Sequence, residues 1–380
     1  MKLAFRPFGL KLVHTWAISR SIKAGGGTDL TSVVLVKLTD GSATGLGEAS
    51  CSKRHAQSVD SIQSFLRLVN PQKLAFDDIP ASMDYLEKLA PNHCSAKCAL
   101  NLALVDGAAR KAGQPVYDLF GLGFREDKHL TSLSIGIDSP AMIRRKVAEA
   151  APFPILKLKI GAPGEKENLA ALRAVDSQKT VRVDANEGWR TKEEALQNLE
   201  WLAQDPHIEF VEQPMPASTP ARDLAWLKSR SPLPLFGDES CQNAGDVAAC
   251  AEAFHGLNVK LVKAGGITPA RDTLLAARRA GLKTMIGCMI ETSLLISAAA
   301  HLAELADHLD IDGNLLISND PFAGATAEHG VVSFARAPEP AGLRVKPKNG
   351  GPFAGGANGF SSASGFPAAR SAPPAADARP

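Results

Sequence analysis

The chain has 380 residues, of which 45% are hydrophobic and 22% charged, and its formal net charge is +2. This composition predicts a sizeable buried core, in one large domain or two medium ones. Basic and acidic residues are mixed along the chain without a basic block, which argues against binding to nucleic acid or anionic lipid.

The N-terminal part of the chain is predicted to contain strands followed by helices. "LAFRPFGLKLVH" lacks the long apolar stretch of a signal peptide and is more typical of a strand. "TSVVLVKLTDGSATGLGEAS" continues the strand pattern, and "SAKCALNLALVDGAARKAG" has helical periodicity. We expect an α+β domain over residues 1–115. The most apolar stretch of the chain is interrupted by Glu291 and is a poor membrane span, so we expect a cytoplasmic protein.

From about residue 116 to residue 330, short apolar runs alternate with amphipathic helical stretches. Eight strand candidates recur about every 25 residues: "TSLSIGI", "PILKLKIG", "TVRVDANE", "IEFVEQP", "LPLFGDES", "LNVKLVKAGG", "LKTMIGC" and "LDIDGNLLI". This alternation predicts a parallel sheet, and eight units favour an α/β barrel. A doubly wound sheet is the alternative, but the glycine-rich turn expected after its first strand is absent.

The end of the chain changes in composition. Residues 331–347 are expected to return to the N-terminal domain. Residues 348–380 are rich in Gly, Ala, Pro and Ser, and we expect this tail to be disordered.

Several predicted strands end in acidic residues. "VRVD" ends at Asp184, "EFVE" ends at Glu212, and "LFGD" ends at Asp238. The C-terminal rim of a barrel brings such positions together, and three carboxylates without a cation would repel one another. An all-oxygen cluster suits Mg²⁺, one ion per subunit. For any one acid taken singly, a helix N-cap is the better explanation, but three in succession, one of them Glu, favour a metal site.

Lysines occupy comparable positions on flanking strands. Lys157 and Lys159 alternate in "PILKLKIG", so both side chains face one side of the strand, and Lys260 ends "LNVK". A lysine near its ordinary pKa of about 10.4 is a poor base at neutral pH. A cationic neighbour and burial would lower the pKa of Lys159 toward ~7–8. The alternative for Lys157 and Lys159 is an edge strand with solvated lysines.

These motifs together resemble the enolase superfamily, in its muconate-lactonising-enzyme subgroup. The ordered series is K-x-K, D-x-N, E-Q-P, D-E-S and N-x-K-x-x-K-x-G-G, together with "GLGEAS" near the N-terminus. The resemblance covers the chain to about residue 347. It implies a modified TIM barrel, (β/α)7β, with an α+β capping domain that carries the substrate-specificity loops.

The resemblance also implies roles for individual residues. Asp184, Glu212 and Asp238 would be the magnesium ligands, and Lys159 and Lys260 the acid/base pair, with Lys157 tuning Lys159. Asn186 and Gln213 would support the ligands. Lys263 lies in the same motif, but strand alternation places it on the other face.

The last predicted strand narrows the resemblance to dipeptide epimerases. Asp310 and Asp312 form an Asp-x-Asp pair that resembles the one holding the substrate α-ammonium group in dipeptide epimerases. Alternatively, Asp310 caps a helix or lies in a turn, and Asp312 belongs to an Asp-Gly turn. Arg20, in "TWAISR", would meet a side-chain carboxylate of the substrate, or else is a solvated loop residue. Met289 and Glu291 would line the pocket, with a structural role for Glu291 as the alternative.

The activity implied is magnesium-dependent epimerisation of a dipeptide by 1,1-proton transfer, with L-Ala-L-Glu from peptidoglycan recycling as the leading candidate. The alternatives are an o-succinylbenzoate synthase, a muconate cycloisomerase, and a catalytically silent metal-binding barrel. The dicarboxylate substrates of the first two bring no ammonium group for Asp310 and Asp312. The silent barrel would be expected to have lost a lysine or a ligand. The sequence leaves the dipeptide and the oligomeric state open, a homo-oligomer included.

Overall fold

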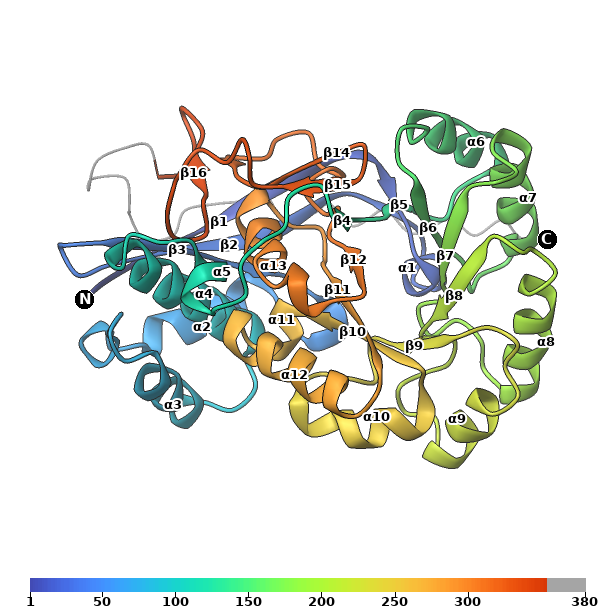
Figure 1. The fold of residues 1–380 in the computed structure, drawn as a ribbon, viewed down its shortest axis with the longest axis horizontal. Coiled ribbons are helices and arrows are strands. Elements are labelled where there is room, and N and C mark those ends of the chain that lie inside the picture. Colours follow the sequence, from blue (N-terminus) through green and yellow to red (C-terminus); the bar gives the residue numbers. More distant parts are fainter. Residues whose placement is uncertain (354–380) are drawn as a thin grey trace, which may run out of the picture.

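The computed structural model describes residues 1–353. Its N-terminal region is an antiparallel sheet of β1 (Lys2–Trp16), β2 (Thr28–Thr39) and β3 (Thr44–Ser50), covered by helices (Figure 1). The main helices of this region are α2 (Val59–Leu68), α3 (Ile79–Leu89) and α4 (Cys94–Lys111). Side chains of β2 alternate between two cores: Val34 and Val36 pack with α2 and α4, whereas Val33 and Leu35 join a core shared with barrel helices.

Helix α4 lies unusually close to β3, and two glycines make this approach possible. A Cβ atom added to Gly45 or Gly47 would lie 1.8 Å from the backbone oxygen of Ala103 or Ala99, respectively. No side chain fits at that distance. The "GLGEAS" motif therefore sets how the helix packs on the sheet.

The central and C-terminal regions form a parallel eight-stranded barrel. Its strands are β5 (Leu133–Ile135), β6 (Ile155–Lys159), β7 (Thr180–Asp184), β8 (Ile208–Glu212), β9 (Leu235–Gly237), β10 (Gly256–Lys260), β11 (Lys283–Gly287) and β12 (His308–Asp310). They pair in chain order from β5 to β12. A parallel bridge between Thr131, which lies just before β5, and Leu309 of β12 closes the barrel.

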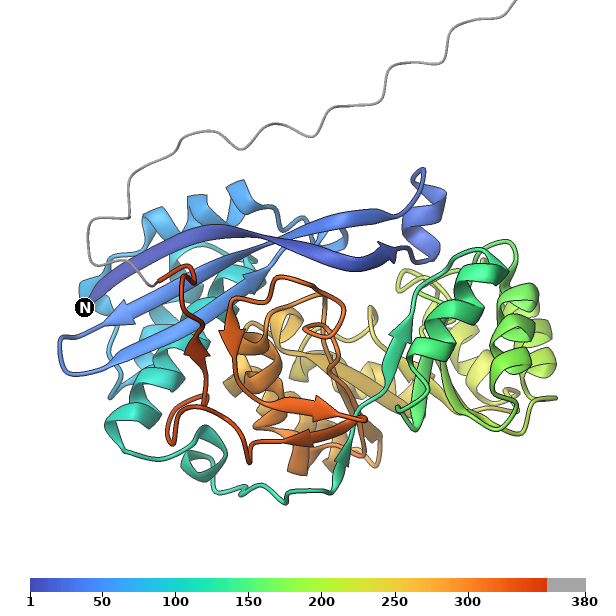
Figure 2. The ribbon, with the colours of Figure 1, turned by 90° about the horizontal axis from the view of Figure 1, so that it is seen from above.

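Helices cover the outside of this barrel (Figures 1 and 2). They are α6 (Pro140–Glu149), α7 (Glu165–Val175), α8 (Lys192–Leu202), α9 (Ala221–Lys228), α10 (Val247–Ala253), α11 (Leu261–Ala264), α12 (Ile267–Arg279) and α13 (Ser293–Ala300). The predicted (β/α)7β barrel with an α+β capping domain is confirmed, and each of the eight predicted strands is present.

Strand alternation separates the barrel wall from its interior. Leu156 and Leu158 of β6 face outward into the core formed with the helices, so Lys157 and Lys159 face inward. Deeper in the barrel, Phe210 and Phe236 stack with ring centroids 4.1 Å apart and pack on Met285. An apolar layer therefore lies beneath the charged groups at the mouth.

The chain then returns toward α4. Leu343 donates its backbone N–H to Asp106 Oδ1 at 2.7 Å, and Arg110 donates to the Val345 carbonyl at 3.0 Å. The short strands of this part are β13 (Phe322–Ala323), β14 (Thr326–Glu328), β15 (Val331–Ser333) and β16 (Lys346–Pro347), with α5 (Val116–Leu119) and β4 (His129–Leu130) beside them. Residues 354–380 of the tail predicted to be disordered lie outside the described residues. Across residues 1–353, every helix is too short or too polar to cross a membrane.

Candidate active site

The C-terminal ends of the barrel strands bring acidic and basic side chains to one place. The strand register sets Lys159 beside Asp184 and Asp184 beside Glu212, and Asp238 directly follows β9. On the far side, Lys260 pairs in register with Gly287, and Gly287 with Asp310. All of these charged residues are at most 7% exposed.

Two lysines flank the carboxylate cluster, by which we mean Asp184, Glu212 and Asp238. Lys159 Nζ lies 2.6 Å from Asp184 Oδ2, and Lys260 Nζ lies 2.9 Å from Asp238 Oδ2. Their strands, β6 and β10, are separated by the three strands that present the cluster. The two ammonium groups therefore approach the cluster from different sides.

Lys157 lies among several carboxylates. Its Nζ is 2.6 Å from Glu212 Oε2, 2.7 Å from Asp310 Oδ2 and 3.2 Å from Asp184 Oδ2. Burial acts to lower the pKa of Lys157, but these three carboxylates outweigh burial and raise it well above its ordinary value. Lys157 therefore stays charged.

The pKa of Lys260 is also raised, against the effect of burial, because Asp238, Glu212 and Glu239 lie near it. A second cation beside these carboxylates would oppose that rise. The predicted use of a lysine as a base at neutral pH therefore depends on such a cation.

The donor chemistry of the cluster fits a hard divalent ion. Burial, together with the charges of Asp184 and Asp238, raises the pKa of Glu212 to about 7, although Lys157 Nζ lies 2.6 Å from Glu212 Oε2. Burial and the neighbouring carboxylates thus disfavour the charged form of Glu212 even beside this ammonium group, and a divalent ion would favour that form, as expected of a magnesium ligand. Within residues 1–353, no three His, Cys, Asp or Glu side chains are arranged to hold a metal ion as they stand. Lysine ammonium groups lie between the carboxylates, so these side chains must rearrange for an ion to bind.

Polar residues next to the cluster fix its orientation. Asn186 donates its backbone N–H to Asp184 Oδ1 at 2.8 Å, and Gln213 Oε1 accepts the backbone N–H of Asp238 at 2.8 Å. Both residues have left-handed backbones, with φ of 44° and 36°. Asn258, which the sequence analysis did not single out, donates to Glu212 Oε1 at 2.8 Å.

The prediction that Lys263 lies on the face opposite to Lys260 is wrong. The strand ends at Lys260 and α11 begins, so alternation no longer applies. Lys263 donates to Asp238 Oδ1 at 2.6 Å, and also to the backbone oxygens of Asp238 and Cys241. Asp238 is consequently held by two ammonium groups, from Lys260 and Lys263.

The Asp-x-Asp pair faces the barrel interior with two different environments. Asp310 pairs with Lys157 and accepts a hydrogen bond from Ser132 Oγ at 2.7 Å, and its pKa is lowered despite burial because Lys157 and Lys159 are near. Asp312 accepts the backbone N–H of Ser134 at 2.6 Å. Burial and the neighbouring Asp310 raise the pKa of Asp312 to about 6. The negative charge of Asp312 is thus less well neutralised than that of Asp310.

Models of two protein families match the chain. Residues 13–121 match the mandelate racemase/muconate lactonizing enzyme N-terminal domain, and residues 141–346 match the enolase C-terminal domain-like family. The second match alone spans more than half of the chain.

The chain belongs to the enolase superfamily.

Similar proteins within this superfamily are described as epimerases. The chain is 60% identical over 349 residues to an L-Ala-D/L-amino acid epimerase of Pedosphaera parvula, a match covering 92% of this chain and all of that protein. It is similar in structure to the substrate-liganded L-Ala-D/L-Glu epimerase from Bacillus subtilis, with TM-score 0.82, 28% identity and coverage of 90% and 97% of the two chains. A dipeptide epimerase from Cytophaga hutchinsonii, complexed with Mg and D-Ala-L-Val, matches with TM-score 0.82, 27% identity and coverage of 91% and 95%.

The superfamily resemblance predicts that Arg20, Met289 and Glu291 contact the substrate, and the surroundings of these three residues differ from one another. Arg20 is bound by two acidic side chains of the barrel rim, Glu187 and Glu239. Met289 is half-buried. Glu291 is fully buried with both carboxyl oxygens unpartnered, and burial beside Glu48 raises its pKa to about 8. Glu291 is therefore largely a neutral acid at pH 7.

Proposed function

We propose that this protein is an isomerase that epimerises one residue of a dipeptide by magnesium-dependent 1,1-proton transfer. The observation that carries the proposal is the placement of Lys159 and Lys260 on β6 and β10, each paired with a different carboxylate of the cluster. Two amines on different sides of one carbon allow one to remove a proton and the other to return it from behind. The related epimerases described above support the choice of reaction.

In this proposal each group has one task. Asp184, Glu212 and Asp238 hold the magnesium ion, which when bound stabilises the negative charge that develops on the substrate as its α-proton leaves. One lysine, in its neutral form, takes that proton. The other, as an ammonium, donates a proton to the opposite face of the same carbon, which inverts the stereocentre and leaves the two lysines with exchanged protonation states.

Asp310 and Asp312 bind the substrate α-ammonium group in this proposal. Asp312 supplies most of the attraction, because the ammonium of Lys157 already balances Asp310. A dicarboxylate substrate, as an o-succinylbenzoate synthase or a muconate cycloisomerase would use, offers no cation to Asp312. Because Asp312 is buried and its negative charge is poorly neutralised, the site favours a dipeptide substrate over the dicarboxylate substrates of both alternatives.

The proposal includes the domain organisation predicted from the sequence. A capping domain over residues 1–115, a barrel over residues 116–330 and a returning segment over residues 331–347 are supported by two observations. The sheet of β1–β3 is separate from the eight-stranded sheet, and the returning segment bonds to α4. A cytoplasmic location and a role in peptidoglycan recycling remain predictions from the sequence.

Proton exchange tests the proposal directly. The protein is incubated with Mg²⁺ in D2O and a panel of dipeptides, and the α-proton signals are followed by ¹H NMR together with the appearance of the second epimer. We expect exchange and epimerisation that stop when EDTA is added. Absence of exchange across the panel, with turnover of the o-succinylbenzoate precursor instead, would refute the proposal.

A further inference from the structure

Two cysteines lie in contact next to a proposed magnesium ligand. Cys241 stands in the loop that follows β9, three positions after Asp238, and Cys250 lies in α10. Their side chains are hydrogen-bonded to each other, and Cys250 Sγ also lies 3.3 Å from the carbonyl oxygen of Ser240. Both thiols are free. The fold therefore brings two reduced thiols from a loop and the following helix together.

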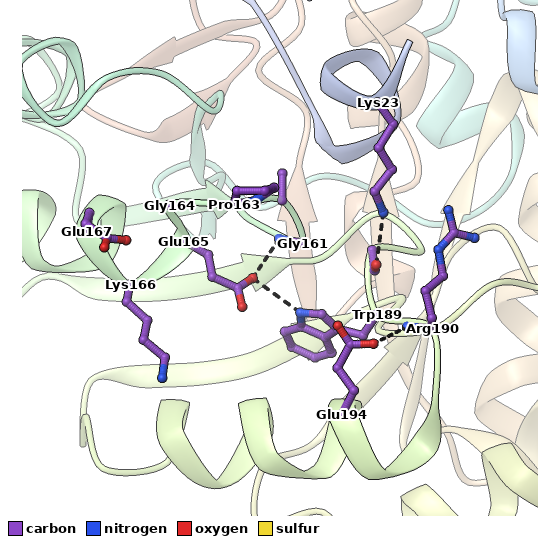
Figure 3. A pocket seen from close by; sticks show the side chains of 12 residues that line it. Lys23, Gly161, Pro163, Gly164, Glu165, Lys166, Glu167, Trp189, Arg190 and Glu194 are labelled. Carbon is purple, nitrogen blue, oxygen red and sulfur yellow. Dashed lines mark hydrogen bonds between the residues drawn. The ribbon is translucent and has the colours of Figure 1, made fainter. Parts of the chain in front are cut away.

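The pair is buried, but the chain between its two members reaches the surface. Cys241 is 2% exposed and Cys250 is 4% exposed, whereas residues 243–245 between them are exposed. Neither cysteine lines the cavity of about 480 Å³ between α1 (Ser19–Lys23) and the loops that follow β6 and β7 (Figure 3). Access to the two sulfur atoms therefore suits a small neutral oxidant, such as hydrogen peroxide, that enters past residues 243–245.

The backbone of Cys241 supports Asp238. Cys241 donates its N–H to the Asp238 carbonyl at 3.1 Å, and its own carbonyl accepts a hydrogen bond from Lys263 Nζ at 2.9 Å. Lys263 in turn donates to Asp238 Oδ1 at 2.6 Å. Ser240, which precedes Cys241, donates its N–H to Gln213 Oε1 at 3.2 Å, and the same oxygen accepts the N–H of Asp238 at 2.8 Å. A movement of Cys241 therefore reaches Asp238 through the backbone and through two side chains.

We propose that Cys241 and Cys250 form a peroxide-sensitive dithiol, and that its oxidation to a disulfide weakens the binding of magnesium at Asp238. A disulfide bond of about 2.05 Å is much shorter than a contact between two thiols, so the sulfur atoms must approach each other. Because α10 is packed against α9 and α12, the loop residue Cys241 moves and displaces the groups that hold Asp238. The disulfide is independent of the proposed function, whereas its effect on magnesium rests on that function.

Hydrogen peroxide supplies the two-electron oxidation. One sulfur of the pair attacks a peroxide oxygen, the O–O bond breaks, and the hydroxide that leaves takes the thiol proton and departs as water. The second sulfur then attacks the sulfenic acid so formed, the S–O bond breaks, and the oxygen leaves with the second thiol proton as another water. The two thiols thus lose two hydrogens, and one peroxide becomes two waters.

A single tryptic peptide reports on the pair. Residues 231–260 end at a lysine, contain no internal Lys or Arg, and hold Cys241 and Cys250 as their only cysteines. The reduced protein is treated with hydrogen peroxide, denatured, alkylated with iodoacetamide and digested with trypsin, and the peptide is measured by mass spectrometry. We expect most of the peptide to be unalkylated and two hydrogens lighter than the dithiol, and doubly alkylated if dithiothreitol is added first. A peptide that stays doubly alkylated after peroxide, or that gains oxygen atoms instead of losing hydrogens, would overturn the inference.

Isothermal titration calorimetry measures the effect on magnesium. The Kd for Mg²⁺ is determined for the reduced protein and for the peroxide-treated protein. We expect a Kd about fivefold higher or more after oxidation, restored by dithiothreitol. An unchanged Kd in protein whose peptide is oxidised would overturn the coupling to Asp238. If the reduced protein binds no Mg²⁺, the proposed function fails and the coupling fails with it, whereas the peptide measurement still decides the disulfide.

Two variants assign the effect to this pair. Cys250→Ser keeps a hydrogen-bond donor near the Ser240 carbonyl but cannot form the disulfide, so we expect peroxide to leave its Kd within about twofold. Cys94→Ser, at a half-buried cysteine of α4, is the matched control and should respond to peroxide as the unmodified protein does. A peroxide-induced loss of magnesium affinity in Cys250→Ser would place the sensitive group elsewhere and refute the inference. If circular dichroism shows that Cys250→Ser does not fold, Cys250→Ala takes its place.

Discussion

Replacement of Lys260 by alanine tests whether the two lysines act on opposite faces of the substrate. The change removes the ammonium 2.9 Å from Asp238 Oδ2, but Lys263 still donates to Asp238 Oδ1 at 2.6 Å. Because Asp238 keeps one charged partner, we expect a loss of about 1.5–3 kcal/mol of unfolding free energy, the contribution typical of one hydrogen bond to a charged group. The variant should therefore remain folded at 25 °C.

The catalytic effect of Lys260→Ala should be much larger and should depend on the epimer. Loss of one general acid–base group typically lowers the rate roughly 10²- to 10⁴-fold, and epimerisation should fall by about that factor. Lys159 is unaffected, because its carboxylate partner is Asp184 on β7. It should still exchange the α-proton of one epimer.

The assay incubates each pure epimer separately with the Lys260→Ala variant and Mg²⁺ in D2O and follows the α-proton by NMR. Exchange of one epimer at a rate within about tenfold of the unmodified enzyme is expected, with slow or no exchange of the other. Lys159→Ala is the matched control and should show the reverse selectivity. Equal exchange of both epimers by Lys260→Ala would refute the assignment of the two lysines to opposite faces.

Three further predictions concern stability. Lys157→Met removes the ammonium shared by Asp184, Glu212 and Asp310, and urea denaturation at pH 7 should show a loss of about 3–5 kcal/mol; a loss below about 1 kcal/mol would contradict the role of Lys157. The pKa of Glu291, which burial and Glu48 raise to about 8, lies above the ~4.3 of an unfolded chain. The folded protein thus keeps a proton that the unfolded chain loses, and stability should fall by up to roughly 1.4 kcal/mol per pH unit between about pH 5 and 8. Glu291→Gln should reduce this slope, and an unchanged slope in urea titrations across that range would disprove the assignment. Gly47→Ala places a methyl group against the Ala99 carbonyl and should lower the thermal unfolding midpoint sharply. Gly9→Ala is the control and should not lower the midpoint, because a Cβ at Gly9 meets nothing within 4 Å. Equal midpoints for the two variants would show that α4 can move away from β3.

Local patterns in the sequence were sufficient to predict the barrel. Each strand of the barrel is a short apolar run before a turn, and alternation within "PILKLKIG" predicts which side chains face inward. The contacts of Asp310 and Asp312, which accept hydrogen bonds from Ser132 Oγ and from the backbone N–H of Ser134, respectively, were not predicted from the sequence. Asn258 and Lys263 both stand in the motif N-x-K-x-x-K-x-G-G. From the sequence, Asn258 received no role and Lys263 was placed on the other face, because the motif does not give the partners of its members.

The partners of the charged groups depend on how the closed barrel brings distant strands together. Lys157 and Asp310 are 153 positions apart, and Arg20 and Glu239 are 219 apart, yet both pairs are in contact. Alternation holds only inside a strand, so it failed for Lys263, which lies in the helix beyond β10. The sequence alone determined the order of the strands and the residue types at their ends, because both depend on neighbours a few positions away. Only the tertiary structure decided which cation neutralises which carboxylate, because barrel closure and the docking of the capping domain set those distances.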